Sequence, residues 1–252
     1  QLVGVGAVNY LTCTGVYALL AFGAGDFLPS RSTLATGLLG GIVYAIAYHL
    51  FVQGMNLRGL SIAAALARIS VLIPILISIV LWGERPNHYQ TVGAALALAS
   101  LALLSIHPGG GPIRVRGLPI LLGLFFANGG CMLALKAFQQ THDPHEAQLF
   151  LLLLFGTAAL IYTVSWFYVR GGSNRKDVFW GLLLGLANVM GNTFILGALE
   201  VLPAVIVFPI SSSLGLLVTA LFATLVWGEV LHRPAFAGMA LAIAAVVLVN
   251  LK

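Results

Sequence analysis

Apolar runs of about twenty residues recur along the whole chain, and each could cross the roughly 30 Å hydrocarbon core of a bilayer as a helix. The 252 residues are 60% hydrophobic and only 8% charged, whereas charged residues make up about a quarter of a soluble domain. The dyad alternation that is typical of membrane β-strands is absent from the sequence. We therefore predict an all-α polytopic membrane protein.

Glycine, proline and charged residues divide the apolar sequence into nine candidate spans. Their approximate bounds are 2–22, 32–53, 59–82, 88–107, 117–138, 145–169, 178–199, 203–227 and 234–251. The connections are short except at 108–116, where the run Pro108-Gly109-Gly110-Gly111-Pro112 indicates a linker. Four spans precede this linker and five follow it.

The sequence contains a duplication with an offset of 145 residues. Leu81-Trp82-Gly83-Glu84 returns as Val226-Trp227-Gly228-Glu229, and Gly93-Ala94-Ala95-Leu96 returns as Gly238-Met239-Ala240-Leu241. Gly40 and Gly185 are separated by the same offset. Because all three correspondences share one offset, we divide the chain into a first repeat (1–107), a linker (108–116) and a second repeat (117–252).

The second repeat has one span more than the first. At the same offset Gln1 corresponds to Glu146, so the span at 117–138 has no counterpart in the first repeat. We infer that a complete molecule has a further helix at its N-terminus, which this sequence lacks, and that it consists of two five-helix repeats. Because five is an odd number, the second repeat would be inverted relative to the first, as in many secondary transporters.

An apolar helix that ends in Trp-Gly-Glu, followed by a short polar turn, occurs twice in the chain, and the turn leads into Gly-Ala-Ala-Leu in the first copy and Gly-Met-Ala-Leu in the second. This pattern, with Pro74 preceding the first copy, resembles the drug/metabolite transporter (DMT) superfamily, specifically EamA-type membrane transporters. The resemblance covers nearly the whole chain. It implies a ten-helix carrier whose central cavity is walled by the first four helices of each repeat, with the fifth of each packed outside. The chain departs from that pattern by lacking the first helix.

Arg68 is the strongest candidate for a substrate ligand. It lies about nine positions into the span 59–82, roughly 13 Å deep, where an ionised side chain costs about 3 kcal/mol unless it faces a cavity or a partner. Ser61, Ala64 and Ala65 precede it on the same face and are small enough to leave a groove. We therefore predict that Arg68 and Ser61 meet an anionic substrate group. Alternatively, Arg68 snorkels to the membrane surface, bonds backbone carbonyls at a helix break or pairs with an acid on the absent helix.

Asn188 and Asn192 are a second pair of candidate substrate ligands. In the span 178–199 they share one helical face with Gly181 and Gly185. Small residues permit close helix approach, and asparagine can then form hydrogen bonds across the gap. Packing between helices is an equal alternative to substrate contact.

Four further polar or aromatic side chains fall inside apolar spans. We predict that they also contribute to substrate binding, with packing as the alternative for each: Tyr44, Tyr48, His49 and Asn128.

Pro74 and Pro209 free backbone carbonyls within their helices and are candidates for gating or for helix breaks, with a simple kink as the alternative. Glu84 and Glu229 follow predicted helix ends, where a negative charge does not complement the helix dipole. We expect each of them to cap the helix that follows, with proton coupling as the lesser alternative.

The sequence contains no Walker loop, no His-Glu-x-x-His motif and no Gly-x-Ser-x-Gly motif, so neither an enzyme nor a cofactor is predicted. The group His142-x-x-His145-Glu146 resembles metal ligands, but Asp143-Pro144 makes it a better match to a helix start, so no metal site is predicted. Basic residues are scattered rather than clustered, which argues against nucleic acid as a partner.

We therefore predict a secondary transporter that moves a small polar metabolite, an amino acid or an organic anion, by alternating access. Its expected partners are this small-molecule substrate, the lipid bilayer and a proton or ion gradient, and it would work as a monomer or homodimer. Its expected location is the cell membrane, specifically the bacterial inner membrane. The alternative function is a membrane scaffold or regulatory subunit that transports nothing.

Overall fold

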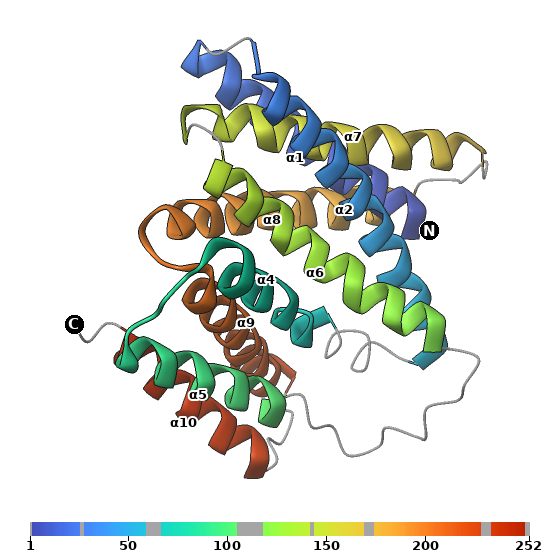
Figure 1. Cartoon of the computed structure of the whole chain (residues 1–252). Helices are drawn as coiled ribbons and strands as arrows, with labels where there is room; N and C mark the ends of the chain where they lie inside the picture. The colour runs from blue at the N-terminus through green and yellow to red at the C-terminus, as the bar shows by residue number, and fades with distance from the viewer. Residues whose placement is uncertain are drawn as a thin grey trace. The chain divides into compact units, whose positions relative to one another are not determined.

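The computed structural model describes residues 2–25, 28–58, 67–104, 118–141, 144–168, 174–227 and 233–249. Within these ranges the regular structure is helical and contains no strand, which confirms the all-α prediction. The helices are α1 (Leu2–Ala24), α2 (Arg31–Arg58), α4 (Leu72–Trp82), α5 (His88–Leu104), α6 (Leu118–Thr141), the 3-10 turn η2 (Pro144–Glu146), α7 (Ala147–Tyr168), α8 (Arg175–Val201), α9 (Ala204–Trp227) and α10 (Arg233–Val249) (Figure 1). The predicted linker 108–116 and Ser61 lie outside the described residues.

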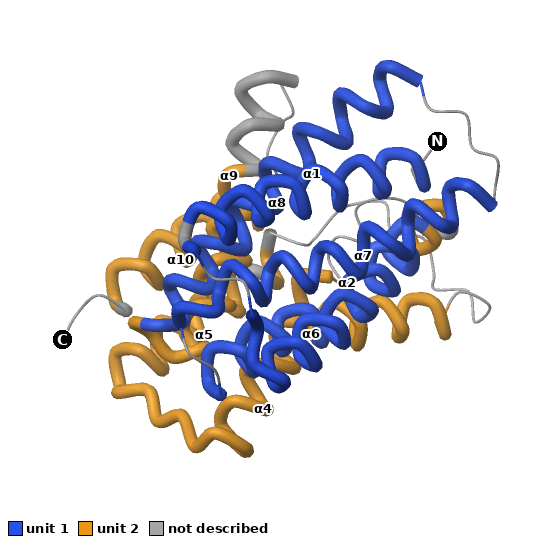
Figure 2. The backbone as a smooth tube through the Cα atoms, turned by 90° about the horizontal axis from the view of Figure 1, so that it is seen from above, with its two compact units in different colours: residues 1–52, 130–200 blue, residues 53–129, 201–252 orange. Residues whose placement is uncertain are grey.

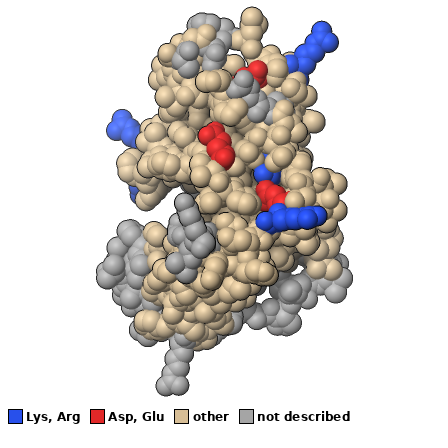
Figure 3. Space-filling model, turned by 60° about the vertical axis from the view of Figure 1, so that its left-hand side comes forward, with Lys and Arg blue, Asp and Glu red and all other residues tan. Residues whose placement is uncertain are grey.

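Five helical segments of the described chain are long and apolar enough to cross a membrane. They are Val3–Gly23, Arg31–Asn56, Leu118–Thr141, Pro144–Tyr168 and Arg175–Val201, while Ala67–Trp82, Ala204–Gly215 and Phe236–Leu248 are shorter apolar helices. Large apolar side chains on these helices are exposed, for example Leu39, Val80 and Phe194. On the face shown in Figure 3, charged side chains occupy only a few separate places. This surface suits a lipid environment, and the count of nine spans stays a prediction.

The helix bounds repeat the 145-residue offset of the sequence motifs. α5 covers 88–104 and α10 covers 233–249, so they correspond at both ends. α1 begins at Leu2 and α7 at Ala147, again 145 residues apart. In the described part of the chain, α6 is the long helix that has no counterpart at this offset.

The chain folds into two compact units (Figure 2). Unit 1 comprises residues 1–52 and 130–200, and unit 2 comprises residues 53–129 and 201–252. Each unit therefore combines segments of both sequence repeats, and the unit boundaries fall within α2, within α6 and before the last residue of α8. The predicted division into repeats 1–107 and 117–252, with a linker at 108–116, concerns the sequence duplication and stays a prediction. It differs from the division into these two units.

α1 and α7 pack along each other in the core of unit 1. They run antiparallel, because Gly6 faces the Tyr162 ring whereas Thr14, eight residues later, contacts Gly156. A Cβ atom at Gly6 would lie 2.9 Å from that ring, so glycine is needed there. Fully buried side chains on these two helices belong to Cys13 and Tyr17 of α1 and to Phe150, Leu154, Phe155 and Ala158 of α7.

Glycines allow α2 to dock on α7 and α8 to dock on α1. A Cβ at Gly185 would lie 2.8 Å from the carbonyl oxygen of Asn9, and a Cβ at Gly40 would lie 3.1 Å from the Leu154 side chain. Gly40 and Gly185 are 145 residues apart, as are Asn9 and Leu154. The two docking contacts therefore use the same register. The close approach predicted at Gly181 and Gly185 is confirmed, since a Cβ at either would overlap α1.

In unit 2, α5 packs along α10, and α9 contacts α4, α5 and α10. Ala97 of α5 and its counterpart Ala242 of α10 are both fully buried. The hydroxyl of Ser213 lies 2.8 Å from the carbonyl oxygens of Ala97 and Pro209, and α9 continues as a helix through Pro209.

The first Trp-Gly-Glu motif ends α4. Gly83 adopts a left-handed conformation (φ 62°), which glycine tolerates best, and donates its N–H to the carbonyl of Ser78. The carboxylate of Glu84 then accepts the backbone N–H groups of Ala204 and Val205 at 3.0 and 3.1 Å. Glu84 thus caps α9, and the prediction that it caps the following helix is wrong.

The following helix, α5, has a cap of its own. Asn87 Oδ1 accepts the N–H of Gln90 at 2.8 Å, and Gln90 Oε1 accepts the N–H of Asn87 at 3.0 Å. This reciprocal capping box satisfies two backbone donors from within four consecutive residues. It leaves Glu84 available for the more distant helix start. Glu229, the counterpart of Glu84, lies outside the described residues.

Candidate functional site

A cluster of amide and phenol side chains joins α1, α2 and α8 within unit 1. We call Asn9, Tyr10, Tyr44, Asn188 and Asn192 the amide cluster. Asn188 Nδ2 donates to Asn9 Oδ1 at 2.8 Å. The Tyr44 hydroxyl donates to Asn192 Oδ1 at 2.6 Å, and Asn192 Nδ2 donates to the Asn188 carbonyl at 2.9 Å. The Tyr10 hydroxyl donates to the Tyr44 carbonyl at 3.0 Å.

The amide cluster lies near the middle of long apolar helices. Tyr44 and Asn188 each lie about 20 Å from the start of their helix, at 1.5 Å per residue, and α2 and α8 contain 28 and 27 residues. The exposed fraction is only 1% for Asn9, 3% for Tyr10 and 8% for Asn192. Polar groups at such a depth need internal partners, and the side chains and backbone carbonyls of these five residues supply several of them.

Asn9 contributes a polar atom that the cluster does not use. Its Nδ2 is buried and has no hydrogen-bond partner within the described residues. An unpaired buried donor costs about 1–3 kcal/mol, and a ligand or an ordered water can satisfy it. The sequence marks Asn9 only as a polar residue in an apolar span, with no spacing that would place it beside Asn188.

Aromatic rings next to the cluster are arranged with two-fold symmetry. Tyr10 and Phe155, which are 145 residues apart in sequence, have ring centroids 6.1 Å apart. Tyr10 also contacts Tyr162 at 5.4 Å, and the counterparts of this pair, Phe155 and Tyr17, are 5.6 Å apart. Contacts that exchange in this way are the signature of a two-fold related interface.

The structure therefore brings together three of the predicted ligands in unit 1, namely Tyr44, Asn188 and Asn192. Tyr48 lies beside them and packs edge-on against Tyr10 and Tyr162, at centroid distances of 5.9 and 5.3 Å. His49 is exposed instead and lines an apolar groove of about 460 Å³ between α1, α2 and α7.

Arg68 belongs to unit 2 and lies against α9. A Cβ atom at Gly215 would be 2.7 Å from Arg68 Nη1, so the absence of a side chain at Gly215 makes room for the guanidinium. Arg68 is half-buried. Its predicted neighbours Ser61, Ala64 and Ala65 lie outside the described residues.

Asn128 of α6 holds the helical turn that carries Arg68. Its Nδ2 donates to the Ala67 carbonyl at 2.6 Å and to Ser70 Oγ at 2.7 Å. Asn128 therefore contacts backbone and serine atoms, and it positions the turn from which Arg68 projects. Its predicted contact with substrate stays a prediction.

The helix that carries Arg68 is interrupted at Ser70 and Val71, four residues before Pro74. Proline has no N–H for the carbonyl four residues earlier, and its ring clashes with that carbonyl. The Ser70 carbonyl instead accepts the N–H of Ile73 at 3.0 Å, a tighter turn. α4 begins beyond this break, at Leu72.

Glu146 lies at the predicted helix start, since η2 begins at Pro144 and leads into α7, and it also contacts the start of α2. Its carboxylate accepts the N–H and the hydroxyl of Ser30, with the hydroxyl at 2.9 Å. Ser30 in turn caps α2 by accepting the N–H of Thr33 at 3.2 Å. His142 and Asp143 lie outside the described residues. In the part of the chain that is described, no group of three or more His, Cys, Asp or Glu side chains could hold a metal ion.

Long apolar helices with a buried polar cluster at mid-length define a polytopic helical membrane protein. The model of the EamA-like transporter family matches residues 3–106 and 115–251, so the chain belongs to that family. It is accordingly a membrane transporter of the drug/metabolite type.

The proteins that are similar to the chain include the following two. A Haemophilus influenzae protein named "Uncharacterized protein" is 24% identical over 200 residues, which cover 76% of this chain and 68% of that protein. A solved chain described as "Crystal structure of protein" superposes with a TM-score of 0.80 at 15% identity, covering 100% of this chain and 89% of the other. The second likeness shows a shared fold.

Proposed function

We propose that the protein is a secondary transporter that moves a small polar metabolite, an amino acid or an organic anion, by alternating access. The observation that carries this proposal is the two-fold related contact between α1 and α7. These helices begin 145 residues apart, they run antiparallel, and their aromatic contacts exchange at that same offset. Antiparallel counterparts are what an inverted duplication requires.

An inverted duplication gives a carrier two equivalent arrangements. Each repeat can adopt the conformation of the other, so a gate that is open on one membrane side becomes closed while its counterpart opens. We infer that the complete molecule has ten helices in two inverted five-helix repeats. The bacterial relative supports a location in the bacterial inner membrane.

Each unit offers its own kind of substrate ligand. The amide cluster presents uncharged donors and acceptors, including the unpaired Asn9 Nδ2, and these suit a hydroxyl, carbonyl or amino group. Arg68 presents a positive charge beside Gly215, and this suits a carboxylate or phosphate. Each kind of ligand by itself suits a small polar metabolite.

Flux in proteoliposomes tests this function. The purified protein would be reconstituted and screened with radiolabelled amino acids and organic acids under imposed proton and sodium gradients. We expect Arg68→Ala to abolish flux of the anionic substrate and Arg68→Lys, which keeps the charge, to retain part of it. Monodisperse size-exclusion profiles would establish that both variants are folded. Unchanged flux in Arg68→Ala would remove Arg68 from the site, and no flux of any compound in the unaltered protein would favour the scaffold.

A further inference from the structure

The outward face of α8 carries basic, aromatic and aliphatic side chains in a fixed order. Phe179, Trp180 and Leu183 follow Lys176 by three, four and seven residues, so all four lie on one face of the helix. All four are exposed. A different face of α8 docks on α1 at Gly181. The outward face can therefore contact lipid.

Two basic residues begin α8. Arg175 and Lys176 are exposed, and neither forms an ion pair within the described residues. Asp177 is next to them, but its carboxylate accepts the backbone N–H of Asn174 at 3.2 Å, which is a contact at the helix start. The first turn of a helix already carries a partial positive charge, so two cations there do not stabilise the helix itself. Their charges are available to an anionic partner.

The aromatic side chains lie one turn deeper than the basic ones. Trp180 follows Lys176 by four residues, which is about 6 Å along the helix. Tryptophan is enriched at membrane interfaces, because its ring is apolar and its indole N–H can donate to polar groups there. Leu183 and Met190 continue the same face with exposed apolar side chains. The order of cation, aromatic ring and aliphatic side chain matches the phosphate, glycerol ester and acyl chain of a phospholipid.

The start of α2, which corresponds to the start of α8, lacks this order. At the 145-residue offset Arg31 takes the place of Lys176. The positions of the two aromatic side chains are occupied in α2 by Leu34 and Ala35. The combination of a cation with aromatic rings one turn deeper is therefore specific to α8 and does not follow from the duplication.

The charge around the two helix starts differs as well. Residues 168–177, which lead into α8, contain three basic side chains and one acidic one. The corresponding residues 23–32, which lead into α2, contain one of each. Glu146 brings a further acid to the start of α2 through its contact with Ser30. The start of α8 is therefore the one that attracts an anionic headgroup.

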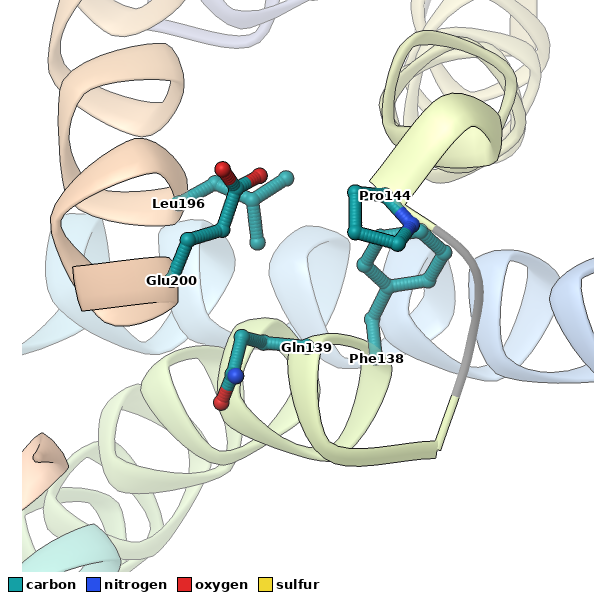
Figure 4. A pocket seen from close by; sticks show the side chains of 5 residues that line it. All are labelled: Phe138, Gln139, Pro144, Leu196 and Glu200. Atoms are coloured by element: carbon teal, nitrogen blue, oxygen red, sulfur yellow. The ribbon is translucent and has the colours of Figure 1, made fainter.

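The other end of α8 is acidic. Glu200 lies there beside a small pocket that Leu196 and Pro144 also line (Figure 4). The last turn of α8 contains no basic residue. An anionic headgroup would be repelled at this end, so the charges of α8 favour binding at its start.

We propose that an anionic phospholipid binds along the outward face of α8. Its phosphate lies on Arg175 and Lys176, its glycerol ester lies beside Trp180, and an acyl chain follows Leu183 and Met190. The guanidinium group of an arginine can form two parallel hydrogen bonds with a phosphate. A zwitterionic lipid has the same phosphate but adds a cation next to the two basic residues, so it binds more weakly. This lipid is a partner in addition to the transported substrate.

Competition between two lipids tests the site. The purified protein in detergent would be mixed with equal concentrations of dioleoylphosphatidylglycerol, which is anionic, and dioleoylphosphatidylcholine, which is zwitterionic. Native mass spectrometry would count the bound lipids. A basic residue at a membrane surface favours an anionic lipid about fivefold, so we expect a preference for phosphatidylglycerol of about tenfold or more. The preference should fall as salt is added, because the two cations are exposed.

Variants at corresponding positions of α8 and α2 separate this site from general charge attraction. Lys176→Gln should reduce the preference about fivefold, and the double variant Arg175→Gln/Lys176→Gln should reduce it to about twofold or less. Arg31→Gln is the matched control, because it neutralises one exposed charge at the same place in α2, and it should leave the preference unchanged. Size-exclusion profiles would establish that all three variants are folded.

Three results would overturn the site. They are equal binding of the two lipids by the unaltered protein, an undiminished preference in the double variant, and an equal loss of preference in Arg31→Gln and Lys176→Gln. None of these measurements depends on flux, so they leave the test of the proposed function separate.

Discussion

Two acidic residues hold helix starts that are far from them in the sequence. Glu84 accepts two backbone N–H groups at the start of α9, and Glu146 binds Ser30, the capping residue of α2. The first N–H groups of a helix have no partner within the helix and carry a partial positive charge. A carboxylate is therefore well matched to them, and each of these contacts links the two sequence repeats within one unit.

We expect Glu84→Gln to destabilise the protein by about 1–2 kcal/mol. The amide keeps one acceptor but loses the negative charge, and its NH2 group faces a backbone donor. Thermal unfolding of the purified protein in detergent would measure the change. Arg85→Gln alters the neighbouring exposed charge and should leave the midpoint unchanged. Equal melting of Glu84→Gln and the unaltered protein would mean that the cap contributes nothing.

At the scale of elements, helix docking depends on where glycines fall. Gly185 lies against Thr12 and the Asn9 backbone, whereas Gly191, on the same helix, has no atom within 4 Å of an added Cβ. The amide cluster depends on this docking, because Asn9 reaches Asn188 only if α1 and α8 are close together.

We expect Gly185→Ala to cost about 1–3 kcal/mol through overpacking, because its Cβ would lie 2.6 Å from Thr12 Cβ and 2.8 Å from a backbone oxygen that cannot rotate away. Gly191→Ala is the matched control, and it should be neutral or stabilising by up to about 1 kcal/mol, since alanine favours helix more than glycine does. Thermal melting of both variants measures the difference. Equal melting temperatures of Gly185→Ala and Gly191→Ala would contradict the close approach of α8 to α1 at Gly185.

Helix positions and the offset between them could be predicted from the sequence, because hydrophobic length and glycine spacing are local signals. The partners of Glu84 and Glu146 could not, since they lie 120 and 116 residues away. The spacing of Asn87 and Gln90 is a capping signal that can be recognised in the sequence. Because these two residues cap α5, Glu84 did not need to be predicted as its cap. The unpaired Nδ2 of Asn9 could not be predicted either, because it results from tertiary packing, for which the sequence contains no local pattern.

For the whole molecule, the decisive property is the direction in which the two repeats cross the membrane. Leu28 lies in the connection that follows α1, and Asn174 lies in the corresponding connection that follows α7. If the repeats are inverted, these two residues lie on opposite sides of the membrane. If the repeats are parallel, they lie on the same side. His145 provides a reference, since the adjacent Glu146 binds Ser30, two residues after Leu28.

We expect Leu28→Cys and His145→Cys to react with a membrane-impermeant maleimide from one side of the membrane and Asn174→Cys from the other. The variants would be made after replacement of Cys13 and Cys131, which are buried, and labelled in right-side-out and inside-out vesicles. Leu28 is 89% exposed, so its replacement should leave the packing unchanged. Labelling of all three positions from the same side would show that the repeats are parallel, and the two-fold contact between Tyr10 and Phe155 would then have to arise without an inverted duplication.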